Sequence, residues 1–371
     1  MKTPDTQTDV GRKTDSMPLS RADLHPTELA LFAALPPACA GRVIITGNRT
    51  GALGLFLARR DPAVTVIQHA CDLYHARALQ RALALNPCDR ISVACTSYLP
   101  EGPPATLGLL QATAHDTPAE LVLDLAEDLH ARLAVGAACL FAYDGRPEWL
   151  RKQVGALFGR VHICAADGSD VTLLQAVKQV APVRRRDFSA SFDASLPGDP
   201  PLRFTTLPGV FAHRRADAGG LALAEVAARE MEAGARILDL GCGCGLAGLL
   251  LAAHAPAADV LGVDAHTRAI LCTTRNAAAN GLANVRTALS DEGTAERGFT
   301  LCVANPPYYS SHRIAELFIR TAYAALAPGG KCYVVAKNPH WIEAFMREMF
   351  GAAEIIPRRG YGVVRAVRRQ P

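Results

Sequence analysis

Short apolar runs alternate along the chain with longer stretches typical of helices. In the second half, residues 235–241, 258–264, 300–305 and 331–337 are apolar runs of strand length. We expect helices over 246–255 and 266–282, and the second of these stretches contains Asn280-Gly281, a common helix C-cap. Strand–helix alternation predicts a mostly parallel sheet with helices on both faces, which binds ligands beyond the carboxyl ends of its strands.

The same pattern occurs twice. When the chain is shifted by 194 residues, residues 42–60 align with residues 236–254, and Asn86 aligns with Asn280. With one or two residues of slip, the similarity continues to Gly159 in the first half and Gly351 in the second. A register held over so long a segment indicates that one fold has been duplicated.

The duplication and the composition between the copies predict the domain organisation. We expect an α/β protein with two tandem Rossmann-like domains, the first of them degenerate. Residues 1–24 are expected to be a disordered tail, 25–183 the first domain, 184–200 a linker and 201–371 the second domain. A length of 371 residues suits two domains.

Composition and charge exclude some classes of protein. No apolar run approaches the roughly 18 residues of a membrane span, and the N-terminus lacks the apolar core of a secretory signal. Eleven cysteines without a Cys-x-x-Cys pair suit a reducing cytoplasm, so we expect a cytoplasmic protein without a metal site. We also expect a monomer. The net charge is +4, and basic residues cluster at 184–187 and near the C-terminus. These clusters suit a polyanionic partner, although a solvated surface is the simpler interpretation.

A glycine-rich loop follows the first strand of the second copy. Gly241, Gly243 and Gly245 alternate with cysteines and allow the backbone to turn tightly and approach a ligand closely. Asp239 lies beside this loop, where a carboxylate repels a pyrophosphate but favours a cationic cofactor. Asp264 ends the next strand, where a carboxylate can accept both hydrogen bonds of a ribose diol. The loop therefore predicts a site for a nucleoside-containing cofactor.

Asn305-Pro306-Pro307-Tyr308 ends a later strand of the same copy. An exocyclic amine on a nucleobase is a poor nucleophile, because its lone pair is delocalised into the ring. The Asn305 side-chain oxygen and the Pro306 carbonyl can both accept hydrogen bonds from such an amine and hold it toward an electrophilic methyl group. Tyr308 offers a flat face for an unstacked base, and the prolines stiffen the turn. We therefore expect a catalytic turn for methylation of an amine.

The first copy has lost these polar groups. At the offset of 194 residues, Ile45 replaces Asp239, Arg49 replaces Gly243, Ala70 replaces Asp264, and Gln111–Ala114 replaces the Asn-Pro-Pro-Tyr turn. The apolar frame persists while the site groups are absent. We therefore expect the first domain to bind no cofactor.

These residues resemble the class I S-adenosylmethionine-dependent methyltransferases. Residues 25–370 as a whole resemble the bacterial ribosomal RNA guanine-N2 methyltransferases, both the small-subunit (16S) enzyme and its large-subunit relative. The segments that carry the resemblance are "LPGVFAHRRADAGG" (207–220), "ILDLGCGCGLAGLLLA", "NAAANGL", "NPPYY" and "VVAKNPHWIEAFMREMFG". The duplication and the 207–220 segment are more specific than the glycine loop alone.

The resemblance implies a function and a role for each site residue. It implies methyl transfer from S-adenosyl-L-methionine to the exocyclic N2 amine of a guanine in ribosomal RNA, with the RNA or a ribosomal subunit as partner. Asp239 and the three glycines would surround the methionine part of the cofactor, and Asp264 would hold its ribose. Ser290 or Asp291 would lie near the adenine. Asp217 is expected to be an N-cap rather than a cofactor ligand.

Several alternatives stay open at this point. The family usually has Phe where this chain has Tyr308, and Tyr is common in adenine-N6 and glutamine-N5 methyltransferases. A cytosine-C5 methyltransferase needs a nucleophilic cysteine, but Cys302 and Cys332 lie in apolar strands, and Cys242 and Cys244 lie in the glycine loop. A non-catalytic RNA-binding scaffold would have lost both sites, and an NAD-dependent oxidoreductase is disfavoured by Asp239.

Overall fold

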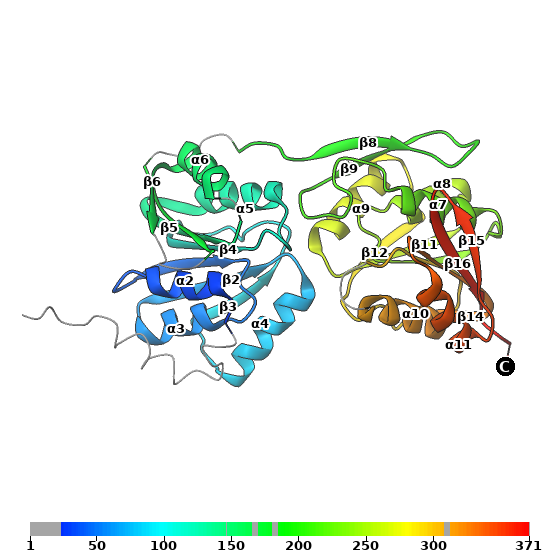
Figure 1. The fold of residues 1–371 in the computed structure, drawn as a ribbon, viewed down its shortest axis with the longest axis horizontal. Helices are drawn as coiled ribbons and strands as arrows, with labels where there is room; N and C mark the ends of the chain where they lie inside the picture. Colours follow the sequence, from blue (N-terminus) through cyan, green and yellow to red (C-terminus); the bar gives the residue numbers. More distant parts are fainter. Residues whose placement is uncertain (1–23, 146, 165–169, 180–184, 308–311, 371) are drawn as a thin grey trace, which may run out of the picture. The chain divides into compact units, whose positions relative to one another are not determined.

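The computed structural model describes residues 24–145, 147–164, 170–179, 185–307 and 312–370. The chain divides into a first unit, Met1–Phe188, and a second unit, Ser189–Pro371. Each unit contains its own seven-stranded sheet (Figure 1). No described helix has the length and apolar character needed to cross a membrane.

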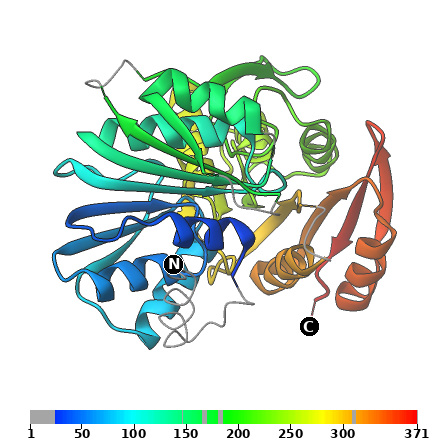
Figure 2. The same cartoon turned by 60° about the vertical axis from the view of Figure 1, so that its left-hand side comes forward.

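The first unit is an α/β/α sandwich. Its strands are β1 (Gly41–Thr46), β2 (Val64–Ala70), β3 (Ile91–Cys95), β4 (Ala105–Ala112), β5 (Leu133–Tyr143), β6 (Gly159–Cys164) and β7 (Thr172–Lys178). Its helices are α2 (Pro26–Ala34), α3 (Ala52–Arg60), α4 (Leu73–Leu85), α5 (Ala119–Arg132) and α6 (Pro147–Phe158). Helices α2 and α3 lie on one face of the sheet, and α5 and α6 lie on the other (Figure 2). Apolar side chains of each helix pair pack against the sheet.

The second unit has the same architecture. Its sheet contains β10 (Arg236–Leu240), β11 (Asp259–Asp264), β12 (Val285–Leu289), β13 (Phe299–Ala304), β14 (Leu326–Ala336), β15 (Glu354–Arg358) and β16 (Tyr361–Val367). Its helices are α7 (Ala218–Ala228), α8 (Leu246–His254), α9 (Thr267–Ala279), α10 (Arg313–Ala325) and α11 (His340–Phe350). One face of the sheet packs on α10 and α11, with Ile319, Met346 and Phe350 at most 1% exposed.

Strand order and register confirm the predicted duplication. The orders are β3-β2-β1-β4-β5-β7-β6 and β12-β11-β10-β13-β14-β16-β15, which are the same order twice. Val43 pairs with Leu107 in the first sheet, and Ile237 pairs with Leu301 in the second, so both partners are displaced by the same 194 residues. Six strands of each sheet run in the same direction, and only β7 in the first sheet and β16 in the second run antiparallel to their neighbours. The fold class predicted from the alternation is therefore confirmed.

The segment expected to be a linker, 184–200, differs from the structure in its second half. Residues Ala190–Ala194 form β8, which pairs antiparallel with β9 (Leu202–Thr206), and the boundary between the units lies at Phe188. The Phe192 ring stacks on the Phe204 ring at 5.4 Å, which stabilises the hairpin. The Pro- and Gly-rich residues between the strands are the hairpin loop rather than an interdomain connection.

Candidate active site

The glycine-rich loop connects β10 to α8. Gly241, Gly243 and Gly245 have φ of 71°, 58° and 86°, which is the left-handed region that glycine adopts without strain. The Gly241 amide donates to the Val263 carbonyl at 2.8 Å, so the loop is tied to the end of β11. A Cβ on Gly243 would meet no heavy atom within 4 Å, whereas one on Gly241 would lie 2.9 Å from the Phe318 ring. The loop therefore has open space at Gly243, as a bound ligand requires.

Asp239 lies under this loop in β10. Its carboxylate is 4% exposed and accepts a hydrogen bond from the Gly248 amide at 3.0 Å. Burial raises the pKa of Asp239 from 3.8 to about 7, and the nearby Asp264 charge adds to the rise. A Cβ on Gly248 would lie 2.7 Å from the Asp239 carboxylate. At the offset of 194 residues Gly248 aligns with Gly54. The sequence did not indicate that Gly248 makes room for the Asp239 carboxylate.

Asp264 closes the other side of the loop, at the end of β11. One carboxylate oxygen accepts from the Gly243 amide at 2.9 Å, and the other accepts from the His266 amide at 2.8 Å. Ser290 and Asp291 follow β12, and the Ser290 amide donates to the Asp264 carbonyl at 2.9 Å. The structure therefore brings the predicted ribose ligand and the predicted adenine-side residues together at the carboxyl edge of the sheet. These residues suit a nucleoside with a cationic substituent.

Asn305 lies at the end of β13, beside the glycine loop. Ala304 pairs with Leu240 in the parallel sheet, so the residues that follow the two strands meet at one edge. The Asn305 side-chain amide donates from Nδ2 to Oδ2 of Asp217 at 2.9 Å. Because a carboxylate accepts and does not donate, this contact determines which end of the amide is the oxygen. Oδ1 of Asn305 is left to accept a hydrogen bond from another group.

Asp217 has two roles at this corner. It is the N-cap of α7, and its Oδ2 accepts from the Gly220 amide at 2.7 Å, as the sequence predicted. The same oxygen receives the Asn305 amide. The second contact joins residues 88 positions apart, so no local pattern in the sequence indicated it. Pro306 is buried beside this contact, whereas Tyr308 lies outside the described residues.

Two buried cysteines and two histidines of the second unit have local structural roles. Burial raises the pKa of the Cys244 thiol to about 12 and that of Cys302 well above its usual range. A protonated buried thiol is a poor nucleophile, which disfavours the cytosine-C5 mechanism. His213 Nδ1 bonds Thr206 Oγ1 at 2.8 Å, and the His266 side chain caps α9.

In the first unit, side chains fill the corresponding corner. Asn48 donates from Nδ2 to Glu28 at 2.8 Å and to Gln111 at 2.9 Å, and Gln111 donates to Thr27 at 2.9 Å. A Cβ on Gly47 would lie 1.9 Å from the Gln111 carbonyl oxygen, so this loop packs directly against the end of β4. The absence of a cofactor from the first unit stays a prediction.

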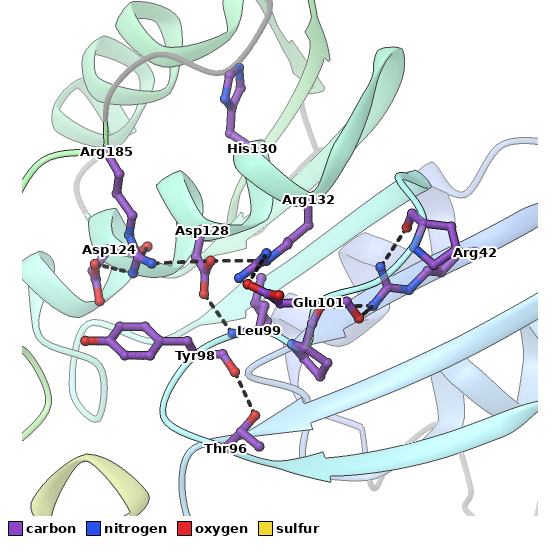
Figure 3. A network of polar contacts seen from close by, with 12 residues as sticks. Arg42, Thr96, Tyr98, Leu99, Glu101, Asp124, Asp128, His130, Arg132 and Arg185 are labelled. Carbon is purple, nitrogen blue, oxygen red and sulfur yellow. Dashed lines mark hydrogen bonds and ion pairs between the residues drawn. The ribbon is translucent and has the colours of Figure 1, made fainter. Parts of the chain in front are cut away.

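The basic clusters are largely used inside the fold. Arg185 pairs with Asp124 at 2.6 Å and with Asp128 at 3.3 Å, and its guanidinium lies over the Tyr98 ring (Figure 3). Asp128 also accepts from the Leu99 amide at 2.7 Å. These acids are at most 5% exposed and need the cation, because an unpaired buried charge is costly.

Arginines near the C-terminus are also paired with acidic side chains. Arg358 and Arg359 both pair with the buried Glu225, and Arg365 pairs with Glu230 at 2.7 Å. The arginines therefore tie β15 and β16 to α7 and the residues after it. These ion pairs give the arginines a structural role, and a polyanion-binding role stays a prediction.

The second unit matches a known family model. Residues 201–365 match the model described as the methyltransferase small domain.

Two curated relatives of the chain are both named ribosomal RNA small subunit methyltransferase C. The Hahella chejuensis protein is 34% identical over 172 residues (43% of this chain and 49% of that protein). The Chromohalobacter salexigens protein is 34% identical over 177 residues (45% and 53%). The chain thus spans about half the length of the curated relatives it matches.

A solved structure matches nearly the whole chain. The match is to the T. thermophilus 16S rRNA N2 G1207 methyltransferase, solved with AdoMet and guanosine, and it covers 94% of this chain and 93% of that chain. The TM-score is 0.77 and the sequence identity 22%. Both copies of the duplicated fold therefore have counterparts in that protein.

Proposed function

We propose that the second unit transfers a methyl group from S-adenosylmethionine to the exocyclic N2 amine of a guanine in small-subunit (16S) ribosomal RNA. Ribosomal RNA or a ribosomal subunit is then the partner. The names of the curated relatives support the substrate class. The observation that carries the proposal is the Asp217–Asn305 contact, because it orients an acceptor oxygen beside the cofactor loop.

The chemistry requires a weakly nucleophilic amine to be activated. S-adenosylmethionine, when bound, supplies the methyl group as an electrophilic carbon. Oδ1 of Asn305 and the carbonyl of Pro306 accept the two N–H groups of the amine, which holds the nitrogen and favours the polarised transition state. As the nitrogen lone pair forms the new N–C bond, the bond between the methyl carbon and sulfur breaks with its electron pair left on sulfur, and one N–H proton passes to water.

The remaining residues hold the reactants in place. Asp217 keeps the Asn305 amide from flipping, so the acceptor is aligned before the substrate arrives. Asp239 supplies negative charge under the loop, where the cationic cofactor is bound. Asp264 anchors the Gly243 and His266 amides, and its carboxylate is the proposed acceptor for the ribose hydroxyls.

Asn305 variants test the proposal. We expect Asn305→Ala to keep cofactor affinity and to lose at least about 100-fold in rate, the scale of losing one aligned acceptor. Asn305→Asp retains an oxygen but sets a second carboxylate against Asp217, so it should also be slow. Asp264→Ala is the contrasting variant, and it should weaken cofactor binding by about 1–3 kcal/mol.

The assay uses ribosomal subunits and rRNA from a strain that lacks the gene, with the modified base mapped by mass spectrometry. Methylated guanine N2 in 16S rRNA is the expected product. An unchanged rate in Asn305→Ala contradicts the role of Asn305. Methylation of adenine N6 or of a protein glutamine would instead support the alternatives that the Asn-Pro-Pro-Tyr turn suggested.

A further inference from the structure

Aromatic rings from two helices form a ladder in the second unit. The His312 ring stacks on the Trp341 ring at 4.1 Å with an interplanar angle of 16°. Trp341 in turn stacks on Phe345 at 5.3 Å and 10°. The Arg320 guanidinium lies over the Phe345 ring at 5.2 Å. We call His312, Trp341 and Phe345 the aromatic ladder.

The ladder lies at the active-site edge of the sheet. His312 immediately precedes α10, and Trp341 lies in the first turn of α11, which follows β14; the two helices lie side by side (Figure 1). Val334 of β14 pairs with Ala304 of β13, the residue before Asn305. Both strands run in the same direction. The ladder and the Asn305 turn are therefore on the same edge of the sheet.

Exposed cations surround the ladder. Arg313, Arg320 and Lys337 are exposed, and none of them pairs with a carboxylate of the residues that the structure describes. Lys337 lies 5.9 Å from the centre of the Tyr361 ring. The nearby acid Glu343 pairs with Arg347 on the same helix. This surface thus differs from the basic clusters at 185–186 and 358–359, whose guanidinium groups already pair with buried acids.

Two rings of the aromatic ladder, Trp341 and Phe345, have a structural function, whereas the packing of the core does not require the His312 ring. Trp341 and Phe345 are half-buried and pack against the core of the second unit. His312 is exposed and has φ of 68°, a conformation that residues other than glycine seldom adopt. A flat ring held on the surface in this way offers a face for further stacking.

We propose that the exposed His312 end of the aromatic ladder stacks an unpaired base of the substrate RNA, next to the base that is methylated. This inference rests on the proposed function and identifies a surface that holds its substrate. Stacking on aromatic rings suits any base, and the surrounding cations suit the phosphates on either side. The base extends the ladder by one ring and does not displace His312.

Tryptophan fluorescence gives a direct test in the full-length protein. The chain has two tryptophans, so Trp149→Phe leaves Trp341 as the only emitter. We titrate this variant with a single-stranded RNA oligonucleotide and with 16S rRNA. RNA binding should quench the fluorescence of Trp341, because the added base stacks on the set of rings to which Trp341 belongs.

His312→Asn removes the ring and keeps a residue that tolerates a positive φ. We expect it to weaken RNA binding and raise the KM for RNA by about tenfold, within the range measured for base–aromatic stacking. The kcat and the cofactor affinity should not change. Arg320→Gln should reduce the salt dependence of RNA binding by about one counterion. Arg347→Gln is the matched control, since Arg347 is already paired, and it should behave as wild type.

Unchanged RNA affinity in His312→Asn, or RNA binding without quenching of Trp341, would overturn the stacking surface. Tighter RNA binding in His312→Asn would also overturn it, because it would mean that the base displaces the ring. Failure of the proposed function gives a different result: RNA quenches Trp341, but rRNA is not methylated.

Discussion

Replacing Asp239 with Asn tests how the site balances stability against cofactor binding. Asp239 is buried and its pKa is raised to about 7. A carboxyl group with a raised pKa in the folded state favours folding when it is protonated. Its contribution is therefore fully present below its usual pKa of 3.8 and is lost as the pH rises through about 7. At pH 8 the folded protein holds an ionised carboxylate in a site that disfavours the charge.

The size of this effect follows from the pKa difference. A shift of about three pKa units corresponds to roughly 4 kcal/mol, which is an upper bound for the cost of ionising Asp239. Asn is neutral and still offers an oxygen to the Gly248 amide. We therefore expect Asp239→Asn to stabilise the cofactor-free second unit by about 2–4 kcal/mol at pH 8 and to have little effect at pH 4.

Urea unfolding of the full chain at both pH values measures this effect. In the Trp149→Phe background, the fluorescence of Trp341 reports the second unit, and the first unit serves as an internal reference by circular dichroism. Calorimetry at pH 8 should show that the same variant binds S-adenosylmethionine at least about tenfold more weakly, because the cation has lost its charge partner. In the wild type, cofactor affinity should rise with pH up to about 7 and then level off.

Two outcomes would refute this reasoning. Equal destabilisation of Asp239→Asn at pH 4 and pH 8 would mean that Asp239 acts as a hydrogen-bond acceptor with no cost of ionisation. Unchanged cofactor affinity at pH 8 would mean that its charge does not contribute to binding.

Two further predictions follow from contacts of the second unit. Asp217→Ala should lose the α7 cap, which is worth about 1 kcal/mol of stability, and should lower kcat about tenfold at unchanged cofactor affinity. Asp217→Asn keeps an acceptor oxygen and should restore both stability and kcat. A kcat equal to wild type in Asp217→Ala would exclude the orienting role of Asp217. Arg359→Gln should lower stability by about 1 kcal/mol, because Glu225 loses one partner, and leave the KM for RNA unchanged; a higher KM with weaker salt dependence would show that the C-terminal arginines bind RNA after all.

The register of the two copies shows how much the chain alone contains. The glycines and apolar residues that recur after 194 residues are those required by strand geometry and tight turns, and both sheets pair at that offset. Alternation of strands and helices also predicts which residues meet at the carboxyl edge. Asp239, Asp264, Ser290 and Asn305 could therefore be grouped before the structure was known.

The linker and the basic clusters show where local composition misleads. A Pro- and Gly-rich composition is typical of hairpin loops as well as of linkers. The fold decides between the two, because Phe192 stacks on Phe204 across the hairpin. Arginine clusters suit RNA or buried acids equally well, and the partner of Arg185 lies 61 residues away.

By itself, the sequence determined the duplicated α/β fold and predicted a cofactor loop and a catalytic turn, because these depend on periodicity and on residues close together in the chain. Only the tertiary structure decided that Asp217 orients Asn305, that arginines of both basic clusters pair with buried acids, and that His312 stacks on Trp341. Each of these contacts joins side chains distant in the sequence, and its energy exists only once the sheet and helices bring the partners within a few ångströms.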